Sequence, residues 1–118
     1  MKADITRIEK PWGHETLFAR TARYAGKLLF IRAGHQLSLQ FHEQKEETIY
    51  VQSGRMRFLF EERPGQLVEI LLEPGDAHHI PPHHQHRMIA VEDCLVFEVS
   101  TPELHDVVRI ADAYGRVV

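Results

Sequence analysis

The stretch that decides the fold runs from residue 34 to residue 54 and reads GHQLSLQFHEQKEETIYVQSG. Its second half predicts a β-strand over Glu47–Gln52, because apolar and polar residues alternate there with a period of two. Its first half predicts another strand over Gln36–His42. Side chains two positions apart in a strand point to the same face, so Gln40 and His42 are expected to lie side by side. The stretch therefore predicts two strands that present polar groups near one end.

The same rhythm of short apolar segments between turns continues along the chain. Met56, Phe58 and Phe60 share one face of their segment, and Gly and Pro residues mark the turns between segments. Further strands are expected over Thr16–Arg20, Lys27–Arg32, Arg55–Glu61, Leu67–Leu72, Ala77–Ile80, His86–Val91, Leu95–Ser100 and Val107–Ile110. About ten short strands without a helical periodicity predict an all-β sandwich or barrel.

Length and composition limit the classes of protein to consider. The 118 residues fit a single domain, 1–118. With 14 Lys and Arg against 17 Asp and Glu, the net charge is -3, so we expect no nucleic-acid partner. We also expect no membrane partner, because no apolar run approaches the roughly 18 residues of a spanning helix. The charged N-terminal residues favour a cytoplasmic location, and the single cysteine, Cys94, excludes an internal disulfide.

Histidine is the residue type that stands out. The chain has nine histidines. Two of them, His42 and His86, lie in predicted strands together with Gln40 and Glu47, and these four side chains offer metal donors. Three separate strands would bring these O and N donors together and leave a position for water or substrate, which is typical of catalytic metal sites. The alternative is that His42 and Glu47 are solvated surface groups. Turn, rim or surface positions are expected for the remaining histidines: His14, His35, His78, His79, His83, His84 and His105.

The spacings around these donors resemble the two motifs of the cupin family. The first motif is a glycine, five residues, His-x-His, three or four residues, Glu, six residues and a glycine; here Gly34, Gln40-Phe41-His42, Glu47 and Gly54 follow it. The second is a glycine, five residues, Pro-x-Gly, two residues and a histidine, and it is matched by Gly75, Pro81-Pro82-His83 and His86, with His83 in place of the motif glycine. The resemblance implies a single-domain jelly-roll barrel that binds one divalent metal ion.

A narrower resemblance extends over nearly the whole chain. Leu37-Ser38-Leu39-Gln40-Phe41-His42 resembles the Leu-Ser-Leu-Gln-x-His segment of phosphomannose isomerases, and the residues from Asp106 to Arg116 resemble their closing segment. Pro11-Trp12-Gly13, Lys27 and Glu98-Val99 also match that family. The best match is the C-terminal cupin domain of the bifunctional mannose-6-phosphate isomerase and mannose-1-phosphate guanylyltransferase. Among the positions that depart from it, Lys45 replaces an arginine, Ala111 replaces a glutamate, and Lys10 replaces the arginine before Pro11.

This resemblance implies a metal-dependent aldose–ketose isomerase that acts on mannose 6-phosphate or a similar sugar phosphate. Zinc is the first choice of metal, with Mn, Fe, Co and Ni as alternatives, and a homodimer is expected. Lys27 and Arg116 are the candidate catalytic residues for contacts to substrate oxygens and phosphate. Ser38, Lys45 and Arg109 are the candidate substrate-binding residues.

Two other functions stay open. The Lys45 and Ala111 departures are compatible with a non-catalytic sugar or metabolite sensor that keeps the pocket. His42, Glu47 and His86 would also suffice for an iron-dependent dioxygenase, which uses two histidines and one carboxylate. Metal content and turnover of a phosphosugar would separate these three functions.

Overall fold

The computed structural model describes residues 1–116. Over this range the chain forms β-strands and no α-helix, so none of it could cross a membrane as a helix. The eleven strands are β1 (Thr6–Lys10), β2 (Gly13–Arg20), β3 (Ala25–Ile31), β4 (Leu39–Phe41), β5 (Glu47–Ser53), β6 (Met56–Arg63), β7 (Gln66–Leu72), β8 (Ala77–Ile80), β9 (His86–Ala90), β10 (Cys94–Ser100) and β11 (Val108–Ala111).

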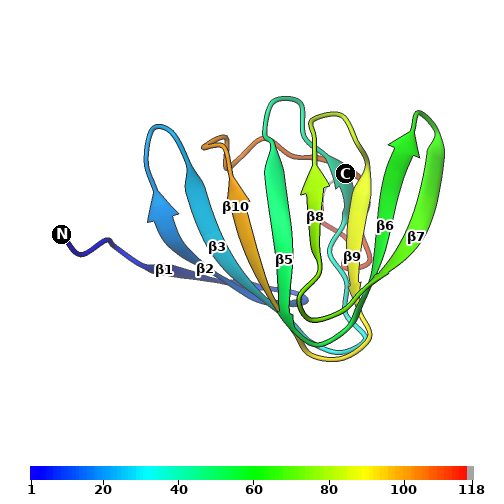
Figure 1. The fold of residues 1–118 in the computed structure, drawn as a ribbon, viewed down its shortest axis with the longest axis horizontal. Helices are drawn as coiled ribbons and strands as arrows, with labels where there is room; N and C mark the ends of the chain where they lie inside the picture. The colour runs from blue at the N-terminus through cyan, green and yellow to red at the C-terminus, as the bar shows by residue number, and fades with distance from the viewer. Residues whose placement is uncertain (117–118) are drawn as a thin grey trace.

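The strands form two antiparallel sheets that face each other (Figure 1). The first sheet has the order β1-β2-β3-β10-β5-β8, and the second has the order β11-β4-β9-β6-β7. Neighbours such as β3 and β10 or β4 and β11 are far apart in sequence. This arrangement is a jelly roll, so the all-β fold class predicted from the sequence is confirmed.

The expected strands differ from the observed ones at two places. β1 was not predicted, because Thr6–Lys10 is short, rich in charge and mostly exposed; it pairs only with β2 as an edge strand. The strand expected over Gln36–His42 is reduced to Leu39–Phe41, although Gln36 still forms an isolated bridge with Ile89. Before Leu39 the segment keeps only single backbone contacts to β9, such as the hydrogen bond from the N–H of Leu37 to the oxygen of Met88 at 3.0 Å.

Sheet register explains why the polar groups gather at one end of the barrel. Leu29 lies opposite Val96, and Val96 lies opposite Val51, and all three are buried in the hydrophobic core. Two residues away from Leu29 and Val96 on the same two strands, Lys27 lies opposite Glu98. Since side chains two apart share a face, these charged residues also point inward. The inner surface therefore changes from apolar to charged along the length of the strands.

The turn that carries the chain from β5 in the first sheet to β6 in the second depends on Gly54. Its φ of 81° lies in the left-handed region that favours glycine. A Cβ atom there would lie 2.1 Å from the backbone oxygen of Asp93, so a side chain has no room. This turn follows β5, the strand that begins with Glu47.

Candidate metal centre

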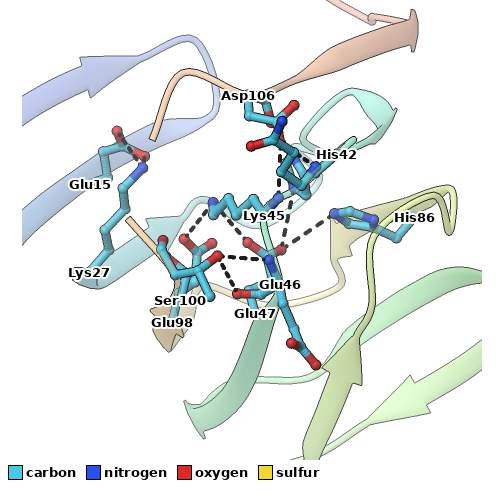
Figure 2. A network of polar contacts seen from close by, with 12 residues as sticks. Glu15, Lys27, His42, Lys45, Glu46, Glu47, His86, Glu98, Ser100 and Asp106 are labelled. Carbon is cyan, nitrogen blue, oxygen red and sulfur yellow. Dashed lines mark hydrogen bonds and ion pairs between the residues drawn. The ribbon is translucent and has the colours of Figure 1, made fainter. Parts of the chain in front are cut away.

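Three side chains converge inside the barrel from separate strands. His42 follows β4, Glu47 begins β5 and His86 begins β9, and all three residues are buried. One ligand atom from each lies within 4.8 Å of the others. Figure 2 shows both imidazoles directed toward the Glu47 carboxylate. The structure therefore brings together three of the four side chains that the sequence predicted as metal ligands.

The two histidines are held in the tautomer that a metal ion requires. His42 donates from Nδ1 to the backbone oxygen of Asp106, and His86 donates from Nδ1 to the backbone oxygen of His84 at 3.0 Å. A carbonyl can only accept, so in the neutral ring the proton is on Nδ1 and Nε2 has a free lone pair. Within residues 1–116, both Nε2 atoms are buried and have no hydrogen-bond partner. Buried nitrogens without partners are costly, and a divalent cation would satisfy them.

Glu47 supplies the negative charge of this centre. Its Oε1 lies 3.7 Å from Nε2 of His42 and 3.5 Å from Nε2 of His86, while Lys45 Nζ lies 2.8 Å from its Oε2. Burial alone would raise the pKa of Glu47, but the two histidines and the Lys45 charge outweigh it and hold the pKa well below its ordinary value. Glu47 is therefore ionised at neutral pH. Two imidazole nitrogens and one carboxylate fit zinc or another divalent transition metal.

Gln40 and Arg109 are placed beside the triad by strand register. Gln40 pairs with His86 across β4 and β9, and Arg109 pairs with Gln40 across β11 and β4. Directly opposed residues in antiparallel strands point to the same face, so the three side chains form a row on the inner surface. Gln40 and Arg109 both line the pocket beside the triad. Gln40 as a fourth ligand remains a prediction.

Asp106 fixes the loop between His42 and Glu47. Its carboxylate accepts hydrogen bonds from the backbone N–H groups of Glu43, Gln44 and Lys45 at 3.1, 2.7 and 2.9 Å. These donors outweigh the effect of burial and lower the pKa of Asp106. The backbone oxygen of Asp106 also accepts the hydrogen bond from Nδ1 of His42, so Asp106 orients both the loop and one candidate metal ligand. Sequence reasoning did not single out Asp106.

The triad opens onto a pocket of about 300 Å³. This volume is at the lower end of the range for small-molecule sites. All five residues predicted to act in catalysis or substrate binding line it, namely Lys27, Ser38, Lys45, Arg109 and Arg116. The lining includes six Lys and Arg side chains but only three carboxylates, although the chain as a whole has a net charge of -3. The pocket is thus more positive than the protein around it.

Most of these cations are already paired with carboxylates. Lys27 Nζ lies 3.3 Å from Oε1 of Glu15, and the Arg116 guanidinium makes two hydrogen bonds to Asp112. Arg109 is different, because its buried Nε has no hydrogen-bond partner among residues 1–116. A guanidinium that lines a pocket and keeps an N–H without a partner among the described residues suits an anionic ligand.

Lys45 lies between two buried carboxylates (Figure 2). Its Nζ is 2.8 Å from Oε2 of Glu47 and 3.1 Å from Oε2 of Glu98. Burial alone would lower the pKa of Lys45, but Glu98 and Glu47 outweigh it and raise the pKa above its ordinary value. The sequence had not indicated Glu15 or Glu98 as pocket residues. For Glu98 a signal existed, since it shares its strand face with the buried Val96 and Cys94.

The other histidines of the 78–86 cluster lie outside the triad. His79 pairs with Glu46 at the surface, and His84 stacks on Phe60. His83 has a φ of 68°, which explains why the cupin motif has glycine at this position. Its backbone N–H donates to the carbonyl of His42 at 2.7 Å, so this turn holds the second motif against the first.

Several solved structures share the fold of this chain. KdgF from Halomonas sp. has a TM-score of 0.71 and 25% identity, with 84% of this chain and 86% of KdgF covered. The capsular polysaccharide assembling protein CapF from Staphylococcus aureus has a TM-score of 0.75 and 17% identity, with 92% and 35% covered. A variant of oxalate decarboxylase from B. subtilis has a TM-score of 0.79 and 16% identity, with 91% and 30% covered.

The last two likenesses show the fold alone, and the chain spans about a third of each of those proteins. Among curated proteins, no sequence matches the chain. The family described as Cupin domain matches residues 27–100, which include the whole triad and most of the strands around it. With its jelly-roll fold and its cluster of two histidines and one glutamate, the chain belongs to the cupin family.

Proposed function

We propose that this cupin is a metal-dependent aldose–ketose isomerase acting on a sugar phosphate such as mannose 6-phosphate. The observation that carries the proposal is the combination of a metal-ligand triad with a cation-rich pocket lined by Arg109, whose Nε has no hydrogen-bond partner within residues 1–116. Such a site suits a small ligand whose anionic group binds the pocket cations while its reacting carbon atoms lie beside the triad. The extended sequence resemblance to phosphomannose isomerases supports the choice of substrate.

The residues divide into two groups in this proposal. His42, Glu47 and His86, with Gln40 beside them, would hold a divalent ion, which would polarise the oxygens at C1 and C2 of the sugar. Arg109, which lines the pocket, would hold the phosphate through its guanidinium. Contacts to a remote phosphate orient the reacting carbons, so they contribute to the rate as well as to the affinity.

Lys27, Arg116 and Ser38 complete the proposed substrate site. Lys27 and Arg116 stay predictions for contacts to substrate oxygens and phosphate. Each already has a carboxylate partner, so a substrate anion would have to share that cation with Glu15 or Asp112. Ser38 is buried on the pocket wall beside Gln40 and offers a hydroxyl to a sugar oxygen.

The test is turnover by the zinc-loaded protein. We expect release of fructose 6-phosphate from mannose 6-phosphate and incorporation of deuterium from heavy water into the sugar. Arg109→Met should raise KM and lower kcat, whereas Arg57→Met, which removes an exposed arginine paired with Glu69, should change neither. Binding of the sugar phosphate without any turnover or exchange would instead support a non-catalytic sensor.

An iron-dependent dioxygenase is the second candidate, because two histidines and one carboxylate are also the donor set of that class. Iron-loaded protein that consumes oxygen in the presence of an organic substrate, while the zinc-loaded protein isomerises no sugar, would favour it over the isomerase.

A further inference from the structure

Glu98 is a buried carboxylate of the pocket that holds no position in the metal triad. It lies on β10, is 6% exposed and lines the pocket beside Glu47. The side chains that face it come from three other parts of the chain. Lys27 lies opposite on β3, Glu47 begins β5, and Lys45 lies in the loop before β5.

The position of Glu98 brings its carboxylate close to the triad. Lys45 Nζ contacts Oε2 of Glu98 at 3.1 Å and Oε2 of Glu47 at 2.8 Å. The two carboxylate oxygens therefore cannot be farther apart than the sum of these distances. A substrate whose C1 and C2 oxygens face the triad would place its carbon atoms within reach of Glu98.

Most of the other bases near the triad are occupied, and His105, which also lines the pocket, is exposed. His42, His86 and Glu47 face one another in the triad, and the Asp106 carboxylate accepts three backbone N–H groups. Lys45 Nζ is engaged by two carboxylates, at 2.8 Å from Oε2 of Glu47 and 3.1 Å from Oε2 of Glu98. Glu15 is the remaining carboxylate, and it contacts both Lys27 and Lys10. Only one of the two oxygens of Glu98 is used by an ion pair within residues 1–116.

We infer that Glu98 is the catalytic residue that transfers the proton between C2 and C1 of the sugar; this inference depends on the isomerase function proposed above. The Glu98 carboxylate removes the proton from C2, the electron pair of the broken C–H bond forms the C1–C2 double bond, and the π electron pair of the C1 carbonyl moves onto the C1 oxygen to give an enediolate. The protonated Glu98 then returns the proton to C1, using the electron pair of the C1–C2 double bond, while the proton of the C2 hydroxyl passes to the C1 oxygen and the C2–O bond becomes the carbonyl of the ketose. The step needs no oxidant or other reactant.

The electrostatic environment of Glu98 suits this role. Burial raises the pKa of Glu98, and the negative charge of Glu47 raises it further. Lys45 and Lys27 oppose this rise without cancelling it. A carboxylate with a raised pKa is a stronger base, and its protonated form is present in a larger fraction at neutral pH.

The experiment compares Glu98→Gln, Glu98→Asp, Glu15→Gln and the surface control Glu69→Gln. The first measurement is the exchange of the C2 proton of mannose 6-phosphate with heavy water by the zinc-loaded protein. The second and third do not depend on activity: zinc affinity by chelator competition, and affinity for a hexitol 6-phosphate, which has no carbonyl to react. Lys45 keeps Glu47 as a partner in Glu98→Gln, so the fold should persist.

We expect Glu98→Gln to reduce proton exchange by at least about a hundredfold, with both affinities unchanged within about threefold. Glu98→Asp should recover part of the exchange, and Glu69→Gln should behave as wild type. The inference is overturned if Glu98→Gln exchanges at a near-normal rate, if it loses zinc or hexitol phosphate affinity together with exchange, or if Glu15→Gln shows the large loss instead. A wild-type protein that exchanges no proton overturns the proposed function, and the role of Glu98 with it.

Discussion

Replacing Glu47 with glutamine should remove most of the stabilisation that zinc gives to the fold. A ligand that binds only the folded state at 100 times its Kd adds about 2.7 kcal/mol to the free energy of unfolding. For 118 residues, an unfolding entropy of about 2.1 cal/mol/K per residue gives about 0.25 kcal/mol/K. Zinc should therefore raise the Tm of the wild type by about 11 °C. A hundredfold weaker site at the same zinc concentration would give only about 2 °C.

The expected loss follows from the position of the carboxylate. Glu47 Oε1 is the only charged atom of the triad, and it faces both imidazole nitrogens at 3.7 and 3.5 Å. Glutamine keeps the size of the side chain but not its charge, so the two neutral imidazoles lose the anion that favours a cation. Lys45 still contacts Glu98 in the variant, which limits the effect on the metal-free protein.

Calorimetric Tm values with zinc and with chelator measure this effect directly. The matched control is Glu46→Gln, because Glu46 is the adjacent residue but pairs with His79 at the surface. This control should keep the full shift of about 11 °C. If Glu47→Gln shows the same zinc-dependent shift as the wild type, the triad is not the metal site and the argument fails.

Three further outcomes are expected. Isothermal titration should show that Arg109→Met raises the Kd for mannose 6-phosphate at least about tenfold, because the guanidinium lines the pocket and offers charge-assisted N–H donors. Denaturant titration should show that Gly54→Ala lowers the free energy of unfolding by at least about 3 kcal/mol, because its Cβ would lie 2.1 Å from a backbone oxygen. Gly75→Ala, whose Cβ would meet no atom within 4 Å, should lower it by only about 1 kcal/mol. Hydrogen bonds from Arg116 lower the pKa of Asp112 from 3.8 to about 2. The resulting stabilisation is present above pH 3.8 and lost as the pH falls through 2. The free energy of unfolding of Asp112→Asn should therefore change less with pH in this range than that of the wild type.

Much of the fold follows from local sequence because most of its strands alternate clearly. Met56, Phe58 and Phe60 are buried as their period of two predicts, and Gly54 and Gly75 lie in turns. Edge strand β1 escaped prediction since it has no buried face of its own. Alternation of apolar and polar residues identifies a strand by the face that it buries. An exposed strand at the edge of a sheet, such as β1, therefore shows little alternation.

The triad could be predicted because its spacing is local within each motif, with His42 and Glu47 in the first motif and His86 in the second. The support around it depends on contacts between distant segments. Asp106 reaches the loop after His42 from near the C-terminal end, and Arg109 joins the row of Gln40 only because β11 pairs with β4. Nothing local in the sequence specifies that pairing.

The lysine at position 45 becomes understandable from these long-range contacts. Glu47 and Glu98 are both buried and would repel each other without a cation between them. An ammonium group is compact and has three donors that rotate freely, so Lys45 can contact both carboxylates at once, as its distances of 2.8 and 3.1 Å require. An arginine, which the sequence resemblance to phosphomannose isomerases leads one to expect here, presents a planar fork that favours bidentate contact with one anion. The departure from that pattern thus links the metal ligand Glu47 to the proposed proton-transfer residue Glu98 through a single charge.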